Sequence, residues 1–215
     1  MAKPLAESRY RLLVEGVDDR NSLIHLMARH SFDWEDETKA RPFVRDAGGV
    51  DELLREIPVT LNGVYERVGI VLDANSDLAA RWMQVRDRAK RAGVDFPPSP
   101  DPGGTIVTGH QPGSRIGAWL MPDNTSPGAL EHFLGGLVLP GPIWSYAAEV
   151  TEEARKRGAP CMEKDHAKSW LYTWLAWQEK PGLPFGTALK GGLFETDSED
   201  ARRFVSWFLR LFVEA

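Results

Sequence analysis

The sequence predicts an α/β fold in which helices cover both faces of a mostly parallel central sheet. Short β-favouring runs alternate with helical patterns along the first 140 residues, and helical patterns alone follow Gly141. Residues 68–72 form an almost entirely apolar run, as expected of a strand that is covered on both faces. Alternation of this kind favours a parallel sheet, because each crossover helix returns the chain to the same edge.

The composition limits the class of protein. A length of 215 residues, with 42% apolar and 27% charged residues, is typical of one sizeable globular domain. No apolar run approaches the roughly 20 residues that cross a bilayer, and the start MAKPLAESRY lacks an apolar signal core, so we expect a cytoplasmic protein without membrane contact. The single Cys161 excludes an internal disulfide framework and a cysteine-based zinc site. A net charge of −5 argues against a nonspecific nucleic-acid coat but allows an enzyme that acts on nucleic acid.

The first two strand and helix pairs follow in order. Residues Tyr10–Val14 form a β-favouring run that is broken at Gly16, and helical spacing follows over residues 19–30. A second strand is expected over residues 42–45. A short helix should follow from Val50, and Pro58 should end it.

The rest of the sheet is predicted around the central strand. Residues 68–72 end at Asp73-Ala-Asn-Ser-Asp77, and a charged helix is expected over residues 78–92. Four prolines prevent regular structure in residues 95–104, which we interpret as a loop inside one domain. Two further strands are predicted at Thr105–Thr108 and at residues 116–121, with a helix beginning near Pro127 or Gly128.

The chain after residue 140 is predicted to be a helical extension. Helical patterns cover residues 145–157, 164–178 and 198–213. We therefore expect an α/β core over residues 1–140 and a helical extension over residues 141–215 that packs on this core in a single globular unit.

Four of the eight tryptophans follow residue 169. Trp170, Trp174 and Trp177 lie about one turn apart on one predicted helix, and the last helix adds Phe204 and Trp207. Stripes of this kind are usually core. A partner surface and base stacking remain the alternatives.

Acidic residues follow four of the five predicted strands, where ligand sites form in open α/β sheets. Carboxylates gathered there repel one another, and a divalent cation removes that cost; an all-oxygen set suits Mg²⁺ or Mn²⁺. The alternative is that the acids cap the helices that follow, which is the commoner role for Asp19 or Asp123 alone. Capping does not explain Glu15. The acids are Glu15, Asp18, Asp19, Asp46, Asp73, Asp77 and Asp123.

Two segments resemble the signatures of the Toprim family. Leu13-Val-Glu-Gly-Val-Asp-Asp19 is similar to the first signature, a strand ending in Glu-Gly with an Asp four residues after the Glu. Val68-Gly-Ile-Val-Leu-Asp-Ala-Asn-Ser-Asp77 is similar to the second, an apolar strand ending in Asp-x-Asp. Toprim domains occur in topoisomerases, primases, RecR-type repair proteins and nucleases of the overcoming-lysogenization-defect (OLD) type. Further segments resemble a family of small, single-domain bacterial Toprim-like proteins: residues 121–124, 128–131 and 164–176.

The resemblance implies a Mg²⁺-dependent (or Mn²⁺-dependent) phosphodiesterase or nuclease with a Toprim, Rossmann-like fold. Glu15 matches the Toprim glutamate, which binds metal or acts as general base. Asp19 and Asp73 match acids of the two signatures, and Asp73 is implied to be a metal ligand. Asn75 stands where the second acid of Asp-x-Asp belongs. Its amide oxygen can still coordinate Mg²⁺, without charge and more weakly, so Asn75 is expected as a ligand but two-metal catalysis is put in doubt. Asp77 is expected to compensate as a ligand two residues further along.

Lys168 is the expected catalytic cation, because OLD-type nucleases use a lysine downstream of their Toprim core. Its alternative is a surface lysine on a helix. Glu131 either completes the ring of acids or belongs only to its own helix. His166 either aids proton transfer or is simply solvated, which is the commoner case.

The resemblance also implies partners. OLD-type nucleases carry a fused ABC-type ATPase, and this sequence has no Gly-x-x-x-x-Gly-Lys-Ser/Thr phosphate loop. We therefore expect a separately encoded AAA- or ABC-type ATPase, in DNA repair or phage defence, with nucleic acid as substrate. The alternative is a noncatalytic Toprim-like binding or scaffold module, which Asn75 and the acidic net charge favour. Nucleotidyl transfer of the primase kind is a third interpretation.

Overall fold

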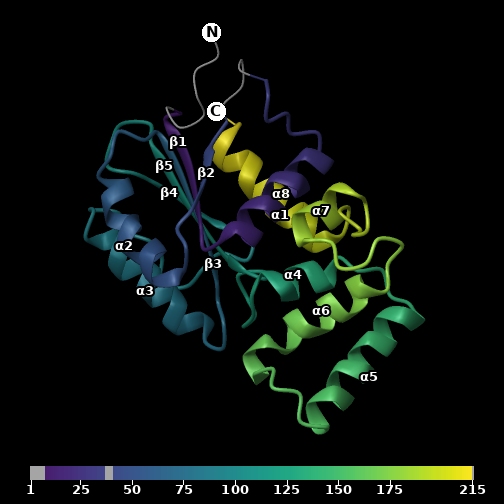
Figure 1. Ribbon diagram of the computed structural model, residues 1–215. Coiled ribbons are helices and arrows are strands. Elements are labelled where there is room, and N and C mark those ends of the chain that lie inside the picture. The colour runs from purple at the N-terminus through teal and green to yellow at the C-terminus, as the bar shows by residue number, and fades with distance from the viewer. Residues whose placement is uncertain (1–7, 37–40, 215) are drawn as a thin grey trace.

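A computed structural model describes residues 8–36 and 41–214 and shows a five-stranded sheet with helices on both faces (Figure 1). The strand order is β2-β1-β3-β5-β4. The first four strands in this order are parallel, and β4 pairs antiparallel with β5 at one edge. The predicted α/β class is confirmed. The strands are β1 (Tyr10–Val14), β2 (Phe43–Asp46), β3 (Arg67–Asp73), β4 (Thr105–Thr108) and β5 (Arg115–Met121).

Alternating side chains of the central strands build a separate apolar layer on each face of the sheet. Ile70 and Leu72 of β3 belong to the layer under α2 and α3, whereas Val71 belongs to the layer on the other face. The second layer is the larger one, and it is covered by α1, α4, α7 and α8. The helices are α1 (Val17–Arg29), α2 (Val50–Leu61), α3 (Leu78–Lys90), α4 (Leu130–Gly136), α7 (Phe185–Lys190) and α8 (Glu199–Phe212).

The last helix, α8, packs directly on the sheet at two paired glycines. Gly69 of β3 and Gly117 of β5 are register partners. A Cβ atom at Gly117 would lie 2.6 Å from Leu211 Cδ2 and 3.1 Å from Trp207 Cζ2. The missing side chains thus let α8 approach the strands closely. Buried residues of α8 belong to the same apolar layer as Val71 of β3 and Trp119 of β5.

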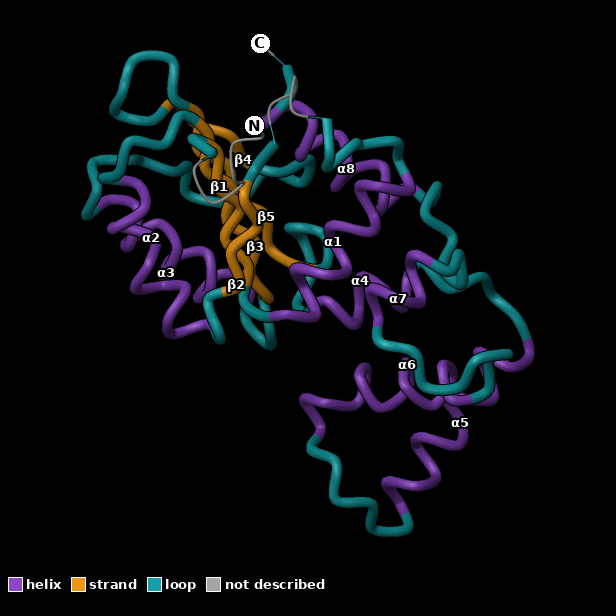
Figure 2. The backbone as a smooth tube through the Cα atoms, turned by 45° about the horizontal axis from the view of Figure 1, so that its top comes forward, coloured by secondary structure: helices purple, strands orange, loops and turns teal. Residues whose placement is uncertain are grey.

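Two helices of the extension form a hairpin that projects from the sheet (Figures 1 and 2). Helix α5 spans Pro142–Lys156 and α6 spans His166–Ala176, after a short 3-10 turn at Glu163–Asp165. These two helices contact each other, and α6 also contacts α4. Helix α4 therefore connects the hairpin to the carboxyl ends of the strands.

Two features of the helices differ from the prediction. Helix α2 does not end at Pro58 but continues to Leu61, because Leu61 is buried in the same apolar layer as Ile57. Helix α7 was not predicted, since its six residues are too few to show a period. It packs tightly on α1, where a Cβ atom at Gly186 would lie 2.8 Å from Asn21 Cβ.

The aromatic residues of the C-terminal helices separate into core and surface. Phe204 and Trp207 of α8 are fully buried, and Trp174 of α6 is nearly so. The core interpretation holds for these three. Trp177 is 43% exposed and Trp170 is partly exposed, so the alternatives stay open for them. Within residues 8–36 and 41–214, no helix combines the length and the apolar character that a membrane span requires.

We predict that α8 is an essential covering layer. Leu211→Ala removes a fully buried side chain that contacts the paired glycines and should lower the free energy of unfolding by about 2–4 kcal/mol. Val213→Ala is the control, because Val213 is 47% exposed, and its effect should stay within about 0.5 kcal/mol. Urea unfolding measures both. Equal effects of the two substitutions would show that α8 is only loosely attached.

Candidate functional site

A pocket of about 470 Å³ lies at the carboxyl ends of β1 and β3. It is lined by the turn into α1, the glycine turn after β2, the start of α4 and one lysine of α6. We call it the carboxylate pocket, because most of its charged side chains are acids. These charged residues are Glu15, Asp18, Asp19, Asp73, Glu131 and Lys168.

Glu15 joins the first strand to the third. Its Oε1 accepts a hydrogen bond of 2.9 Å from the backbone N–H of Asp73. Its carbonyl oxygen accepts the N–H groups of Gly48 and Gly49, at 3.0 and 2.8 Å. Both glycines have positive φ, +84° and +135°, which a side chain would strain. The turn after β2 therefore holds Glu15 in place through its backbone.

The side chains of Asp19 and Asp73 each bond a backbone amide. Asp73 Oδ1 accepts the N–H of Leu130 at 2.9 Å, which connects β3 to the first residue of α4. Asp19 Oδ2 accepts the N–H of Gly16 at 3.1 Å, so Asp19 does cap α1. Capping uses only one of its oxygens. Asp19 Oδ1 is buried and has no hydrogen-bond partner among the described residues.

The acids of this pocket hold protons more tightly than exposed acids do. Burial, followed by the charge of Glu15, raises the pKa of Asp73 to about 8. The same two causes raise the pKa of Asp19 to about 7. Burial also raises the pKa of Glu15, although the Asp73 N–H and the charge of Arg81 oppose it. The fold thus keeps three carboxyl groups together at an electrostatic cost.

Two cations lie near these acids. Lys168 Nζ is 3.0 Å from Glu131 Oε1. Burial lowers the pKa of Lys168, but the hydrogen bond and charge of Glu131 outweigh burial and raise it overall. Lys168 is therefore protonated at neutral pH. Arg81 of α3 acts on Glu15 through its charge, and its buried Nε has no hydrogen-bond partner among the described residues.

The predicted site residues are only partly brought together. Glu15, Asp19, Asp73 and Lys168 line one pocket, and Glu131 joins them. The other two predicted ligands, Asn75 and Asp77, do not line it: Asn75 lines a neighbouring pocket, and the exposed Asp77 caps α3 by accepting the Ala80 N–H at 2.9 Å. Of the remaining acids, Asp18 also lines the carboxylate pocket. The other two have local roles: Asp46 pairs with Arg20, and Asp123 accepts hydrogen bonds from the N–H and hydroxyl groups of Thr125 and Ser126.

Three contributors were missed by the sequence reasoning. The segment Asp46-Ala-Gly-Gly49 follows a predicted strand, so its glycines carried a signal for a turn at the site. Arg81 lies in the charged helix expected over residues 78–92, where several other basic residues gave no reason to single it out. The Leu130 N–H had no signal, because a backbone amide is present at every residue except proline.

The carboxylate pocket has the oxygen ligands that a divalent cation prefers, but its acidic side chains are not close enough together to bind one as they stand. Its donors are all oxygens, and the buried, unpartnered Asp19 Oδ1 lacks a positive partner. Yet within the described chain no three His, Cys, Asp or Glu side chains are placed closely enough to hold a metal ion as they stand. Both Glu15 and Asp73 use an oxygen on a backbone amide instead. A metal ion therefore requires these side chains to turn toward it.

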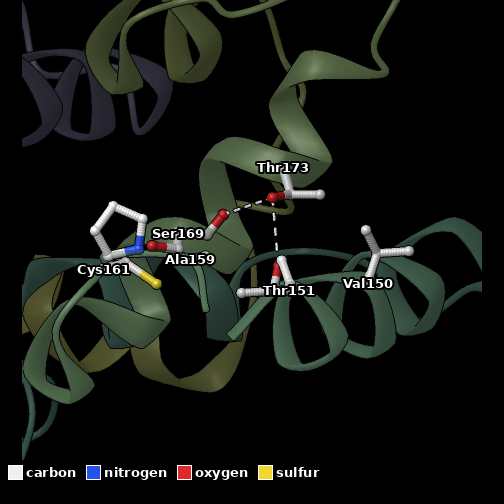
Figure 3. A pocket seen from close by; sticks show the side chains of 8 residues that line it. Val150, Thr151, Ala159, Cys161, Ser169 and Thr173 are labelled. Atoms are coloured by element: carbon white, nitrogen blue, oxygen red, sulfur yellow. Dashed lines mark hydrogen bonds between the residues drawn. The ribbon is translucent and has the colours of Figure 1, made fainter. Parts of the chain in front are cut away.

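A separate pocket of about 470 Å³ lies between α5 and α6 (Figure 3). Cys161 lines it beside Thr151 and Thr173. The hydroxyl of Thr151 donates to the Ala147 carbonyl at 2.7 Å, and that of Thr173 donates to the Ser169 carbonyl at 2.8 Å. Because these hydroxyl donors are already used within their own helices, this pocket is less suited to a polar ligand.

Comparison with known proteins gives a family. The family described as "Protein of unknown function (DUF3226)" matches residues 9–213, almost the whole chain. The chain belongs to this family. All of the carboxylate pocket, from Glu15 to Lys168, lies inside the part that matches the DUF3226 family. Neither the curated proteins nor the solved structures include a match to this member of the family.

We predict that the pocket destabilises the metal-free protein as pH rises. The raised pKa values of Asp19 and Asp73 mean that the folded state binds more protons than the unfolded state from about pH 4 to about pH 8. Stability should therefore fall across this window. Asp73→Asn keeps the acceptor for the Leu130 N–H and removes one charge, so it should raise stability by about 1–3 kcal/mol near pH 8.5 and by clearly less near pH 5.

Thermal unfolding in EDTA at several pH values measures this effect. Asp77→Asn is the matched control, because an asparagine still caps α3 and Asp77 lies outside the pocket. The account of the pocket's charge is contradicted if Asp73→Asn and Asp77→Asn give the same pH profile as the unsubstituted protein.

Proposed function

We propose that this protein is a Toprim-type, Mg²⁺-dependent (or Mn²⁺-dependent) phosphodiesterase that cleaves nucleic acid. The observation that carries the proposal is the meeting of Glu15, Asp19 and Asp73 at the carboxyl ends of two neighbouring parallel strands. These acids lie where α/β sheets bind ligands, and burial together with the charge of Glu15 raises the pKa values of Asp19 and Asp73. The resemblance to the Toprim signatures at the same residues supports it.

The roles follow from the contacts. Glu15, Asp19 and Asp73 would hold the cation, which supplies charge to polarise the phosphoryl oxygens. Glu15 is also placed to accept the proton of the attacking water, since its raised pKa makes it a better base than an exposed glutamate. Lys168 stays charged and turns toward the same pocket, where its charge can offset that of the leaving oxygen. Glu131 positions Lys168.

The proposal includes partners and a location. The sequence has no phosphate loop of its own, so we propose a separately encoded AAA- or ABC-type ATPase, in DNA repair or phage defence. A cytoplasmic location belongs to the same proposal, because nucleic acid and the ATP that a partner consumes are found there.

A noncatalytic binding or scaffold module is the second candidate. Two observations favour it: Asn75, in the place of the second acid, lies outside the carboxylate pocket, and the described acids are not spaced to hold a metal as they stand. A module of this kind would bind nucleic acid or a partner without cleaving it. The two candidates differ in whether cleavage occurs and whether it needs Glu15.

We predict metal-dependent cleavage that needs Glu15 and Asp73. Purified protein should cleave plasmid, single-stranded DNA or RNA with Mg²⁺ or Mn²⁺, and EDTA should abolish cleavage. Glu15→Gln keeps an acceptor for the Asp73 N–H but removes the base, so the rate should fall by at least about 100-fold. Asp73→Ala should cause a similar loss. Gel electrophoresis of labelled substrates measures the rates.

Asp77→Asn serves as the control for acids outside the pocket and should keep full activity. The assay is repeated with the candidate ATPase and ATP present. Absence of cleavage under both conditions would favour the noncatalytic module, and cleavage that survives Glu15→Gln would place the active site elsewhere.

A further inference from the structure

A second pocket lies beside the carboxylate pocket, and we propose that it binds an unpaired nucleotide next to the phosphodiester that is cleaved. We call it the Trp170 pocket. Its volume is about 660 Å³, which is in the range of small-molecule sites. The proposal rests on the proposed function and deepens it, because it makes single-stranded nucleic acid the substrate class.

The same three segments line both pockets. The last residue of β3, Asp73, lines the carboxylate pocket, and Asn75 in the turn that follows lines the Trp170 pocket. The approach to α4 contributes Gly128 and Ala129 to the Trp170 pocket, whereas the next two residues of the chain line the carboxylate pocket. On α6, Lys168 lines the first pocket and its neighbours line the second. A single nucleic-acid strand can therefore extend from one pocket into the other while staying in contact with these three segments.

The ring of Trp170 is held in a fixed orientation. It stacks on Trp144, with ring centroids 4.0 Å apart and planes 16° from parallel. Its Nε1–H donates to the Trp144 carbonyl at 3.0 Å. Trp170 is partly exposed and lines the pocket while Trp144 covers one face of its ring, so we assign the base to the part of the ring that stays accessible. A fixed aromatic face of this kind suits base stacking, which tolerates any base.

Polar groups in the pocket suit the edge of a base. The Nδ1 atom of His132 accepts the Ala129 N–H at 3.1 Å, so the proton of the neutral ring is on Nε2, which can donate. The side-chain amide of Asn75 is exposed and makes no hydrogen bond to the part of the chain that is described. This amide supplies an NH₂ group with two N–H donors and a carbonyl oxygen as acceptor. Unpaired bases are recognised through such edge contacts.

The charge of this pocket suits phosphate. Glu163 pairs with Arg155, which also pairs with Glu152, so the charge of Glu163 is offset in part. Lys164 is exposed and has no ion pair within residues 8–36 and 41–214. His166 directs its Nε2 toward Glu152, 3.7 Å away, and so away from a phosphate role. The ammonium group of Lys164 places a positive charge in the Trp170 pocket, next to the acidic carboxylate pocket. There it can contact a phosphate group of a nucleic-acid strand that spans both pockets.

Stacking on Trp170 requires a base that is outside a duplex. A paired base has both faces covered by its neighbours and its edge hydrogen-bonded to its partner, so it cannot enter a walled pocket without being unstacked. A single strand avoids that cost. The Trp170 pocket therefore selects single-stranded or locally unpaired substrate.

Binding measured without cleavage tests this inference. In the Glu15→Gln protein, fluorescence anisotropy of an end-labelled single strand should show binding at least about 10-fold tighter than that of the same sequence as duplex. Trp170→Leu should weaken single-strand binding roughly 5- to 100-fold, and Trp170→Phe, which keeps an aromatic face, should restore part of it. Lys164→Ala and Asn75→Gly should each weaken it several-fold; glycine suits Asn75, whose φ is +54°.

Matched controls are available just after the end of α6. Trp177→Leu removes an aromatic side chain that is stacked on Tyr146 and does not line the pocket, and Lys180→Ala removes an exposed lysine; both should leave binding within about 2-fold. If Trp170→Leu fails to fold, as judged by circular dichroism, Lys164→Ala and Asn75→Gly still decide the matter.

The outcomes are distinct from those of the cleavage assay. Single-strand binding that depends on the Trp170 pocket, without any cleavage, supports the nucleotide-binding part of the inference and contradicts the proposed nuclease activity. Cleavage that is unchanged by Lys164→Ala and Asn75→Gly, or equal binding of single strand and duplex, overturns the inference and leaves the nuclease. If adenosine monophosphate displaces the single-stranded nucleic acid and binds as tightly as it does, the assignment of a polynucleotide ligand is overturned and the pocket is a site for free nucleotides.

Discussion

One chain of hydrogen bonds sets the geometry of the candidate site. The Glu15 carboxylate accepts the Asp73 amide, and the Asp73 carboxylate accepts the Leu130 amide, so β1, β3 and α4 are joined at their functional ends. Because α6 packs on α4, the same bonds determine where Lys168 and Trp170 lie relative to the sheet. Acidic side chains here act as structural connectors and as candidate ligands at once.

This arrangement has an electrostatic cost that a purely structural role does not explain. A serine or asparagine could accept a backbone amide without bringing negative charge to a partly buried position. The fold instead places Glu15, Asp19 and Asp73 together, where burial and mutual repulsion raise their pKa values. Groups with such shifts concentrate at functional sites. A cation at this position would turn the repulsion into attraction.

Sequence reasoning reached the sheet and the central acids but not their detailed partners. The strands could be predicted from apolar runs such as residues 68–72, because a strand that is buried on both faces of a sheet must be apolar at nearly every position. The rule that strands end at one edge brought Glu15 and Asp73 together. The same rule could not predict that Asp73 and Asn75 line different pockets. Asn75 adopts a left-handed backbone conformation and forms a β-bridge with Gly128, and both features redirect the chain after Asp73. The short α7 and the amide of Leu130 left no pattern to detect.

Calorimetric titration of the metal-free protein with Mn²⁺ near pH 7 tests the central claim most directly. Repeated in buffers of different ionisation enthalpy, it reports the protons released on binding as well as the stoichiometry. Because Asp19 and Asp73 have pKa values of about 7 and about 8, one bound ion should release about one proton or slightly more. Asp73→Asn should abolish or greatly weaken this binding. No saturable binding, or equal binding by Asp73→Asn, would contradict a cation site between these carboxylates.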